Sequence, residues 1–305
     1  WIILDYISVV TSDRWTKPLN RSVNQYCRCF IPKIGVIQHE NDTIFGMGTF
    51  RLEGEVAYNA VKMALETGYR HIDTAQIYGN EAEVGQAIAD SGLARDEFFL
   101  TTKVWLDNLG MEVFKSSVEE SLRKLQVEAV DLLLIHWPDV SGKVEMDSYL
   151  EQLLEVQRKG LTRLIGVSNF TNAQLDEAVE ILGADAIFTN QVEVHPYLQN
   201  RRVIDHCQAK GIQVTGFMPL AVGKVMQDKV LQAIAATHNV TVAEVVLAWQ
   251  LQQNLVTIPS STKRVNLETN LKSVELVLSD DEMAKIALLD KGERIANPEF
   301  SPEWD

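Results

Sequence analysis

The stretch from Gly68 to Gly85 reads GYRHIDTAQIYGNEAEVG and decides how the chain is interpreted. Its segment His71–Asp73 predicts a short buried strand that ends in a carboxylate, and Tyr78 follows five positions after Asp73. An acid at the C-terminal end of a strand, with a phenol in the next loop, is typical of the face on which an α/β barrel carries its chemistry.

Two further predicted strands end in ionisable residues. Residues 98–103 form an apolar run that ends in Lys103, and residues 130–136 form another that ends in His136. Buried Lys and Asp side chains are seldom unpaired, so packing alone does not explain an ionisable group at the same end of three consecutive strands. If these strands are neighbours in a parallel barrel, the side chains of Asp73, Lys103 and His136 converge near Tyr78.

The same stretch predicts the start of a helix. Asn80 is a candidate N-cap residue, and Glu83 stands three positions later, where its side chain would complete a capping box.

Strand and helix patterns alternate from residue 46 onward, which predicts an α/β fold, a (β/α)8 TIM barrel. The first expected strand ends within residues 46–50. The other seven span 71–73, 98–103, 130–136, 164–168, 187–191, 213–217 and 255–258. The expected helices span 55–67, 81–89, 112–125, 147–159, 172–182, 200–210, 227–238, 241–253, 264–273 and 280–290. These are two helices more than eight strand–helix units require.

The first residues differ in pattern from the rest. Residues 1–26 are interpreted as an extension of poor order, and residues 27–305 as a single barrel domain. Residues 1–10 are apolar, but no basic region precedes them and no clear cleavage site follows, so a secretory signal is not favoured. A targeting or partner-binding segment is the alternative.

Composition excludes several classes of protein. The net charge of −14 argues against nucleic acid and anionic membrane surfaces as partners. Three cysteines cannot form a disulfide framework, and Cys27-Arg-Cys29 has no second pair to complete a zinc site. No apolar run approaches the roughly 18 residues of a spanning helix. We therefore expect a cytoplasmic protein without a metal.

Several phrases together resemble the aldo-keto reductase family, and within it the bacterial 2,5-diketo-D-gluconate reductase B group. The resemblance runs from about Ile44 to Asp305. Besides the opening stretch, it rests on the phrases IHWP (135–138), GVSNF (166–170), NQVEVHPYLQN (190–200) and IPSSTKR (258–264). It implies a carbonyl reductase that uses a nicotinamide cofactor and acts as a monomer. Residues 34–37 and 43–45 flank a polar turn, and the resemblance implies that this predicted hairpin plugs the N-terminal mouth of the barrel.

The resemblance also implies a catalytic tetrad. Tyr78 is the expected general acid, because a phenol donates a proton well if its pKa approaches the working pH. The nearby ammonium of Lys103 favours the phenolate and so lowers that pKa, while Asp73 keeps Lys103 charged. His136 is expected to orient the substrate carbonyl or to relay a proton.

The cofactor residues follow from the same resemblance. Ser168, Asn169 and Gln191 end two strands with groups that suit a nicotinamide carboxamide, and Phe217 is expected to stack on its ring. The full expected set is Gly48, Thr49, Asp73, Ser168, Asn169, Gln191, Phe217, Leu220, Ser261, Lys263, Arg264 and Asn270.

The expected cofactor is NADP(H) rather than NAD. Ser260 and Asn266 stand where many relatives carry cationic residues. Lys263 and Arg264 nevertheless lie at the start of a predicted helix, where a phosphate is favoured. Ser261, Lys263 and Arg264 are therefore the expected contacts of the 2′-phosphate.

The substrate is expected to be a small carbonyl compound, such as 2,5-diketo-D-gluconate or methylglyoxal. Phe50, Trp105 and Trp137 correspond to aromatic wall positions of the family, with His136 at the reacting end. His195 is expected to support a loop only. The chain ends soon after Trp304, so we expect a fairly open pocket without long substrate-binding loops.

Two other functions remain open from the sequence. Lys103 at a strand end is also the position of a Schiff-base lysine in an aldolase-type lyase. The second alternative is a barrel that binds NADP as a sensor without turnover.

Overall fold

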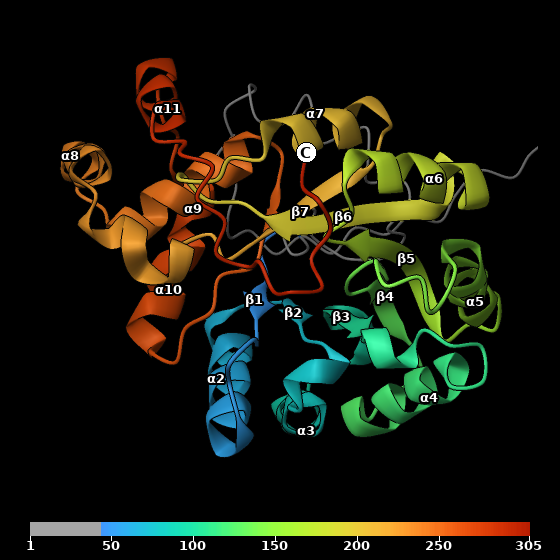
Figure 1. Cartoon of the computed structure of the whole chain (residues 1–305). Helices are drawn as coiled ribbons and strands as arrows, with labels where there is room; N and C mark the ends of the chain where they lie inside the picture. Colours follow the sequence, from blue (N-terminus) through green and yellow to red (C-terminus); the bar gives the residue numbers. More distant parts are fainter. Residues whose placement is uncertain (1–43) are drawn as a thin grey trace, which may run out of the picture.

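The computed structural model describes residues 44–305, and it contains one sheet of eight parallel strands in sequential order (Figure 1). The strands are β1 (Met47–Gly48), β2 (His71–Asp73), β3 (Phe99–Val104), β4 (Val130–Ile135), β5 (Thr162–Ser168), β6 (Ile187–Glu193), β7 (Gln213–Phe217) and β8 (Val256–Thr257). β3 and β4 are buried along their whole length, as expected for parallel strands covered on both faces.

Backbone hydrogen bonds join the first strand to the last. Phe45 forms a parallel bridge with Thr257, and the Gly46 N–H donates to the Thr257 carbonyl at 2.8 Å. The Thr257 N–H in turn donates to the Ile44 carbonyl at 3.0 Å. The sheet is therefore closed into a ring, which confirms the predicted arrangement of eight parallel strands. The predicted extension, and the predicted hairpin except for its last two residues, lie outside the described part of the chain.

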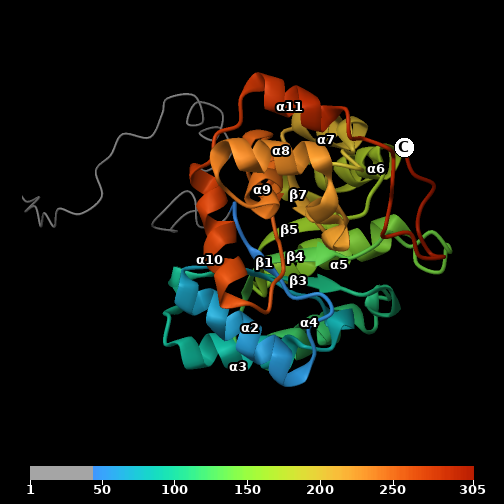
Figure 2. The same cartoon turned by 90° about the vertical axis from the view of Figure 1, so that its left-hand side faces the viewer.

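Helices surround this ring (Figures 1 and 2). They are α2 (Gly54–Thr67), α3 (Glu81–Ser91), α4 (Phe114–Leu125), α5 (Met146–Arg158), α6 (Asn172–Leu182), α7 (Arg201–Ala209), α8 (Lys229–His238), α9 (Val242–Gln252), α10 (Arg264–Lys272) and α11 (Asp280–Ala287). The predicted strand and helix limits differ from these by at most three residues. The two additional helices, α8 and α11, lie side by side on the outside of the barrel.

α4 shows why the sequence forms such an outer layer. Phe114, Val118, Leu122 and Leu125 recur at helical spacing and are buried, while the lysines and glutamates between them face outward. In the described part of the chain, no single helix has the length and apolar composition to cross a membrane; α8 and α9 reach it only as a pair bent by 91°.

The capping box predicted at Asn80 is wrong. The Asn80 side chain makes no cap hydrogen bond to α3 and instead donates to the carbonyls of Thr49 and Leu52 at 2.9 and 2.8 Å. It also accepts the Thr74 hydroxyl at 2.8 Å. Asn80 thus ties the loop after β1 to the loop after β2. It therefore holds the segment that follows Gly48 against the segment that carries Tyr78.

Helices α3 and α4 approach closely at Gly85. A Cβ at this position would lie 2.4 Å from the Lys124 carbonyl oxygen and 2.6 Å from the Leu125 backbone. Both contacts are with backbone atoms near the end of a helix, so they cannot be relieved by a side-chain rotation.

We expect Gly85→Ala to destabilise the protein by about 1–3 kcal/mol, because the added methyl group forces α3 and α4 apart. Urea unfolding followed by circular dichroism measures this. Gly110→Ala is the matched control, since a Cβ there meets only the Val113 side chain at 3.9 Å. Equal stability of the two variants would contradict the close approach.

Candidate active site

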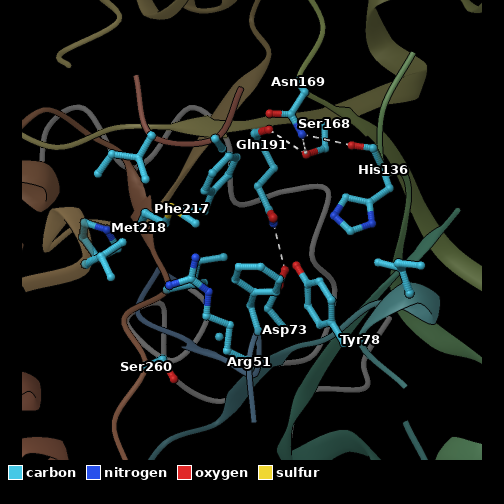
Figure 3. Close-up of a pocket in the computed structure, with 18 of the residues that line it drawn as sticks. Arg51, Asp73, Tyr78, His136, Ser168, Asn169, Gln191, Phe217, Met218 and Ser260 are labelled. Carbon is cyan, nitrogen blue, oxygen red and sulfur yellow. Dashed lines mark hydrogen bonds between the residues drawn. The ribbon is translucent and has the colours of Figure 1, made fainter. Parts of the chain in front are cut away.

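A cavity of about 740 Å³ opens at the C-terminal ends of the strands (Figure 3). Its wall includes the predicted residues Gly48, Phe50, Asp73, Tyr78, Trp105, His136, Trp137, Ser168, Asn169, Gln191, Phe217 and Leu220. These residues come from the ends of several strands and the loops after them, so the fold brings together most of the predicted site.

Three residues of the predicted tetrad form a chain in which Asp73 and Lys103 are buried and Tyr78 is partly buried. The Lys103 ammonium lies 2.5 Å from Asp73 Oδ1, donates to the Thr74 carbonyl at 2.7 Å and lies 3.5 Å from the Tyr78 hydroxyl. The Lys103 side chain is fully buried. Asp73 pairs in register with Thr101, and Lys103 follows two residues later on the same face of β3, which places the two charges together.

Gln191 completes the environment of the Asp73 carboxylate. Its amide nitrogen donates to Asp73 Oδ2 at 2.8 Å, from the opposite side of the ring (Figure 3). The sequence predicted a nicotinamide contact for Gln191. In the structure one N–H of its amide is used on Asp73, so Gln191 supports the tetrad as well as lining the cavity.

Burial and charge set the protonation of this group. Burial lowers the pKa of Lys103, but the charge of Asp73 and its hydrogen bond raise this pKa by more than burial lowers it. The net pKa of Lys103 therefore lies above its usual value. Burial raises the pKa of Tyr78, and the charge of Lys103 opposes this only in part. The expected lowering by Lys103 is present, but burial outweighs it, so the net pKa of Tyr78 lies above its usual value and Tyr78 is a protonated phenol at neutral pH.

His136 lies beside the phenol. Its ring centroid is 5.5 Å from that of Tyr78 and 5.3 Å from that of Trp105, both edge-on. Burial, and then the charge of Lys103, hold the pKa of His136 well below its usual value. The imidazole is therefore neutral, with one ring nitrogen as donor and the other as acceptor. Its Nδ1 is buried and has no partner within residues 44–305.

The end of β5 offers an amide-binding group that fits a nicotinamide. The Asn169 side chain donates to the His136 carbonyl at 3.0 Å and to the Ser168 hydroxyl at 3.1 Å. Its Oδ1 is buried and has no partner within the described residues. The carboxamide N–H₂ of a nicotinamide is a donor that would satisfy this oxygen, and Phe217 supplies an adjoining ring.

The remaining predicted cofactor residues lie beyond the wall of this cavity. The Thr49 hydroxyl is buried and donates to the Asp73 carbonyl at 3.1 Å. Lys263 is exposed at the N-terminus of α10, and its N–H donates to the Ser261 hydroxyl at 3.2 Å. Arg264 forms an ion pair with Glu66, and Asn270 is a buried residue of α10 itself.

Several wall residues were not predicted from the sequence, and two groups of them bear on the chemistry of the site. Arg51, next to Phe50, is the only Lys or Arg among the described residues that line the cavity. The C-terminal segment contributes Ile295, Ala296, Asn297, Pro298 and Phe300. The Phe300 ring lies edge-on to Trp105 at 5.5 Å and to Trp137 at 5.4 Å. Sequence reasoning expected a fairly open pocket and named no residue of this C-terminal segment as part of its wall. An aromatic residue near the chain end was the only signal.

The geometry does not suit a Schiff base. A lysine must lose its proton before it attacks a carbonyl, whereas Lys103 is held as an ammonium by Asp73 and the Thr74 carbonyl. The arrangement suits proton transfer from Tyr78 to an oxygen in the cavity, with a neutral imidazole beside it.

Comparison with known proteins places this chain in a family. Residues 44–291 match the Aldo/keto reductase family. The chain is 50% identical over 262 residues to methylglyoxal reductase DkgB of Escherichia coli O157:H7, covering 86% of this chain and 98% of that protein. It is 42% identical to glyoxal reductase of Bacillus subtilis, covering 84% and 92% of the two chains.

A solved structure gives the same result. The crystal structure of a candidate 2,5-diketo-D-gluconic acid reductase B superposes with a TM-score of 0.83 at 43% identity, covering 86% of this chain and 93% of that one. The family match spans the strands that carry Asp73, Lys103 and His136 together with the loop of Tyr78. The chain therefore belongs to the aldo/keto reductase family of oxidoreductases.

Proposed function

We propose that this protein uses NADPH to reduce small aldehydes and ketones, with methylglyoxal and 2,5-diketo-D-gluconate as the leading substrates. The observation that carries the proposal is the buried Asp73–Lys103 pair with Tyr78 next to it, beside a neutral His136 at the wall of the cavity. The substrates follow from relatives named as methylglyoxal, glyoxal and 2,5-diketo-D-gluconic acid reductases.

In the proposed reaction, Tyr78 donates its phenolic proton to the substrate oxygen as the carbonyl carbon is reduced. Lys103 keeps its positive charge and stabilises the phenolate that this step leaves. A neutral His136 donates a ring N–H to the same oxygen and orients the carbonyl. A bound nicotinamide cofactor supplies the hydride, and Asn169 and Ser168 are the proposed contacts of its carboxamide.

The preference for NADPH rests on charge outside the cavity. Lys263 and Arg264 stand at the N-terminus of α10, where helix N–H groups favour an anion. Arg264 is already paired with Glu66, whereas no ion pair within residues 44–305 involves Lys263. We propose Lys263 as the main contact of the 2′-phosphate, with Ser261 and Arg264 beside it. Gly48, Leu220 and Arg51 then line the path of the cofactor toward the tetrad.

The aromatic wall limits the substrate. Phe50, Trp105, Trp137 and Phe300 line the cavity around Tyr78 and His136. Because the nicotinamide must share this space, a compact carbonyl compound fits best. All proposed residues come from one chain, so the proposal needs no second subunit, and we propose a monomer that acts in the cytoplasm.

The reductase is favoured over an NADP sensor because a binding protein has no need of a fully buried lysine held beside a protonated phenol. Consumption of NADPH with methylglyoxal, followed by absorbance, separates the two functions. Binding of NADPH without consumption across a wide aldehyde panel would favour the sensor.

We expect Tyr78→Phe to lower the rate of methylglyoxal reduction by about 10²–10⁴-fold while NADPH binding is retained, because only the proton donor is lost. Steady-state rates and fluorescence titration with NADPH measure the two effects. Tyr58→Phe is the control, since that hydroxyl binds Asp90 at the surface. Equal rates for Tyr78→Phe and wild type would refute the role of Tyr78.

We expect the chemical step of reduction to vary by less than about twofold between pH 6 and 9. The raised pKa values of Tyr78 and Lys103 keep both groups protonated over this range, and the lowered pKa of His136 keeps it neutral. Single-turnover reduction measures this step without product release. An apparent pKa inside the range would show that one of the three titrates there.

We expect Lys263→Met to weaken NADPH binding about tenfold and to leave NADH binding within twofold, because only NADPH carries the 2′-phosphate. Fluorescence titration with both cofactors measures this. Lys272→Met, at the other end of α10, is the matched control. Equal weakening for NADPH and NADH, or the same loss in the control, would count against the assignment.

A further inference from the structure

The C-terminal wall of the cavity has almost no hydrogen-bonded structure of its own. From residue 291 to the end of the chain there is neither helix nor strand. The two backbone bonds within the segment join Arg294 to Gly292 and Ser301 to Pro298. In Figure 1 it crosses in front of the strand ends, and five of its residues line the cavity. Its position must therefore be set by other elements.

The carboxylate of Glu193, the last residue of β6, holds this segment. Its Oε1 accepts the Ile295 N–H at 2.8 Å, and its Oε2 accepts the Ala296 N–H at 2.7 Å. The Glu193 side chain is fully buried. Both oxygens are thus used on successive amides of the wall, and charge-assisted bonds of this kind are stronger than neutral ones.

His195 and Asn200 strengthen the same link. The His195 Nε2 lies 2.8 Å from Glu193 Oε1, and because a carboxylate only accepts, this nitrogen carries the proton. The Asn200 amide donates to the Glu193 carbonyl at 2.5 Å and accepts a bond from Arg294 at 3.2 Å. The end of β6 is therefore connected to the wall through both its side chain and its backbone.

The same strand also holds the tetrad. Gln191 stands two residues before Glu193, on the same face of β6, and donates to Asp73. Two residues of a strand span roughly 6–7 Å. One short piece of backbone therefore fixes the catalytic carboxylate at one end and the substrate wall at the other.

We propose that Glu193 is a positioning residue that sets the distance between the wall at 295–300 and the tetrad, and thereby the size of carbonyl substrate that the site accepts. This rests on the proposed reductase function. The group that contacts the substrate is Phe300, whose ring packs on Trp105 and Trp137. Glu193 acts through the segment that carries it.

The test compares a small and a bulky dicarbonyl compound, methylglyoxal and phenylglyoxal. Glu193→Gln replaces an accepting oxygen with an N–H₂ group, so one wall amide loses its partner. We expect the KM for phenylglyoxal to rise about tenfold with kcat changed less than threefold, and a smaller change in KM for methylglyoxal. The Kd for NADPH should stay within twofold. Equal losses for both substrates, or a changed NADPH Kd, overturn the proposal.

Glu282→Gln is the matched control. The Glu282 carboxylate accepts the Ser279 N–H at 2.8 Å and the His238 Nε2 at 2.9 Å, but it lies on α11 and does not line the cavity. A role limited to stability predicts similar behaviour of the two variants. The proposal requires that only Glu193→Gln change the ratio of KM values for the two substrates.

A double-mutant cycle separates the wall from other effects. If Glu193 acts through Phe300, Glu193→Gln should add less than twofold to the phenylglyoxal KM in a Phe300→Ala background. Independent, multiplicative effects overturn the proposal. If Glu193→Gln does not fold, His195→Leu removes one bond to the carboxylate, and a shift in the same direction but smaller is expected; no shift overturns the proposal.

Amide hydrogen exchange keeps this test distinct from that of the proposed function. Glu193→Gln should speed exchange at Ile295 and Ala296 in the cofactor-free protein, whether or not any carbonyl compound is reduced. Unchanged exchange at these two amides would show that Glu193 does not hold the segment, and would overturn the proposal. Absence of NADPH consumption by the wild-type protein, with faster exchange in the variant, would instead reject the reductase function and with it the substrate role of Glu193.

Discussion

The burial of the Lys103 ammonium is the constraint on which the site depends. A charge removed from water is tolerated only when it is paired and hydrogen-bonded, and here Asp73 and the Thr74 carbonyl meet that need. Asp73 in turn requires Gln191 from across the barrel. The ion pair is therefore stable only if β2 and β3 are in register and the sheet closes, so the fold and the tetrad require each other.

The same charges also determine the protonation states of Tyr78 and His136. Lys103 stays charged because Asp73 outweighs the effect of burial, whereas Tyr78 stays a phenol because burial outweighs the effect of Lys103. His136 is neutral because burial and the nearby ammonium both oppose a second positive charge. The cavity therefore presents one proton donor and one neutral hydrogen-bonding ring to a substrate oxygen, with the positive charge held behind them.

β6 supports two parts of the site, the tetrad and the C-terminal wall, that lie far apart in the sequence. Gln191 reaches the tetrad and Glu193 reaches the C-terminal wall, from positions two residues apart. Asn80 does the same for the loops after β1 and β2. In both cases the sequence places a polar side chain at a strand end or a helix cap. In the structure this side chain instead forms hydrogen bonds with a segment far along the chain. These links give irregular loops a fixed place without secondary structure of their own.

The sequence by itself determined the alternation of strands and helices and the convergence of Asp73, Lys103 and His136, because periodicity and strand-end position are local properties and parallel neighbours bring equivalent ends together. It predicted the wrong partners for Asn80 and did not find Arg51 or Phe300. It found the lowering effect of Lys103 on the pKa of Tyr78 but not the larger, opposite effect of burial. Only the tertiary structure decided these points, because burial and long-range hydrogen bonds depend on which distant segments meet.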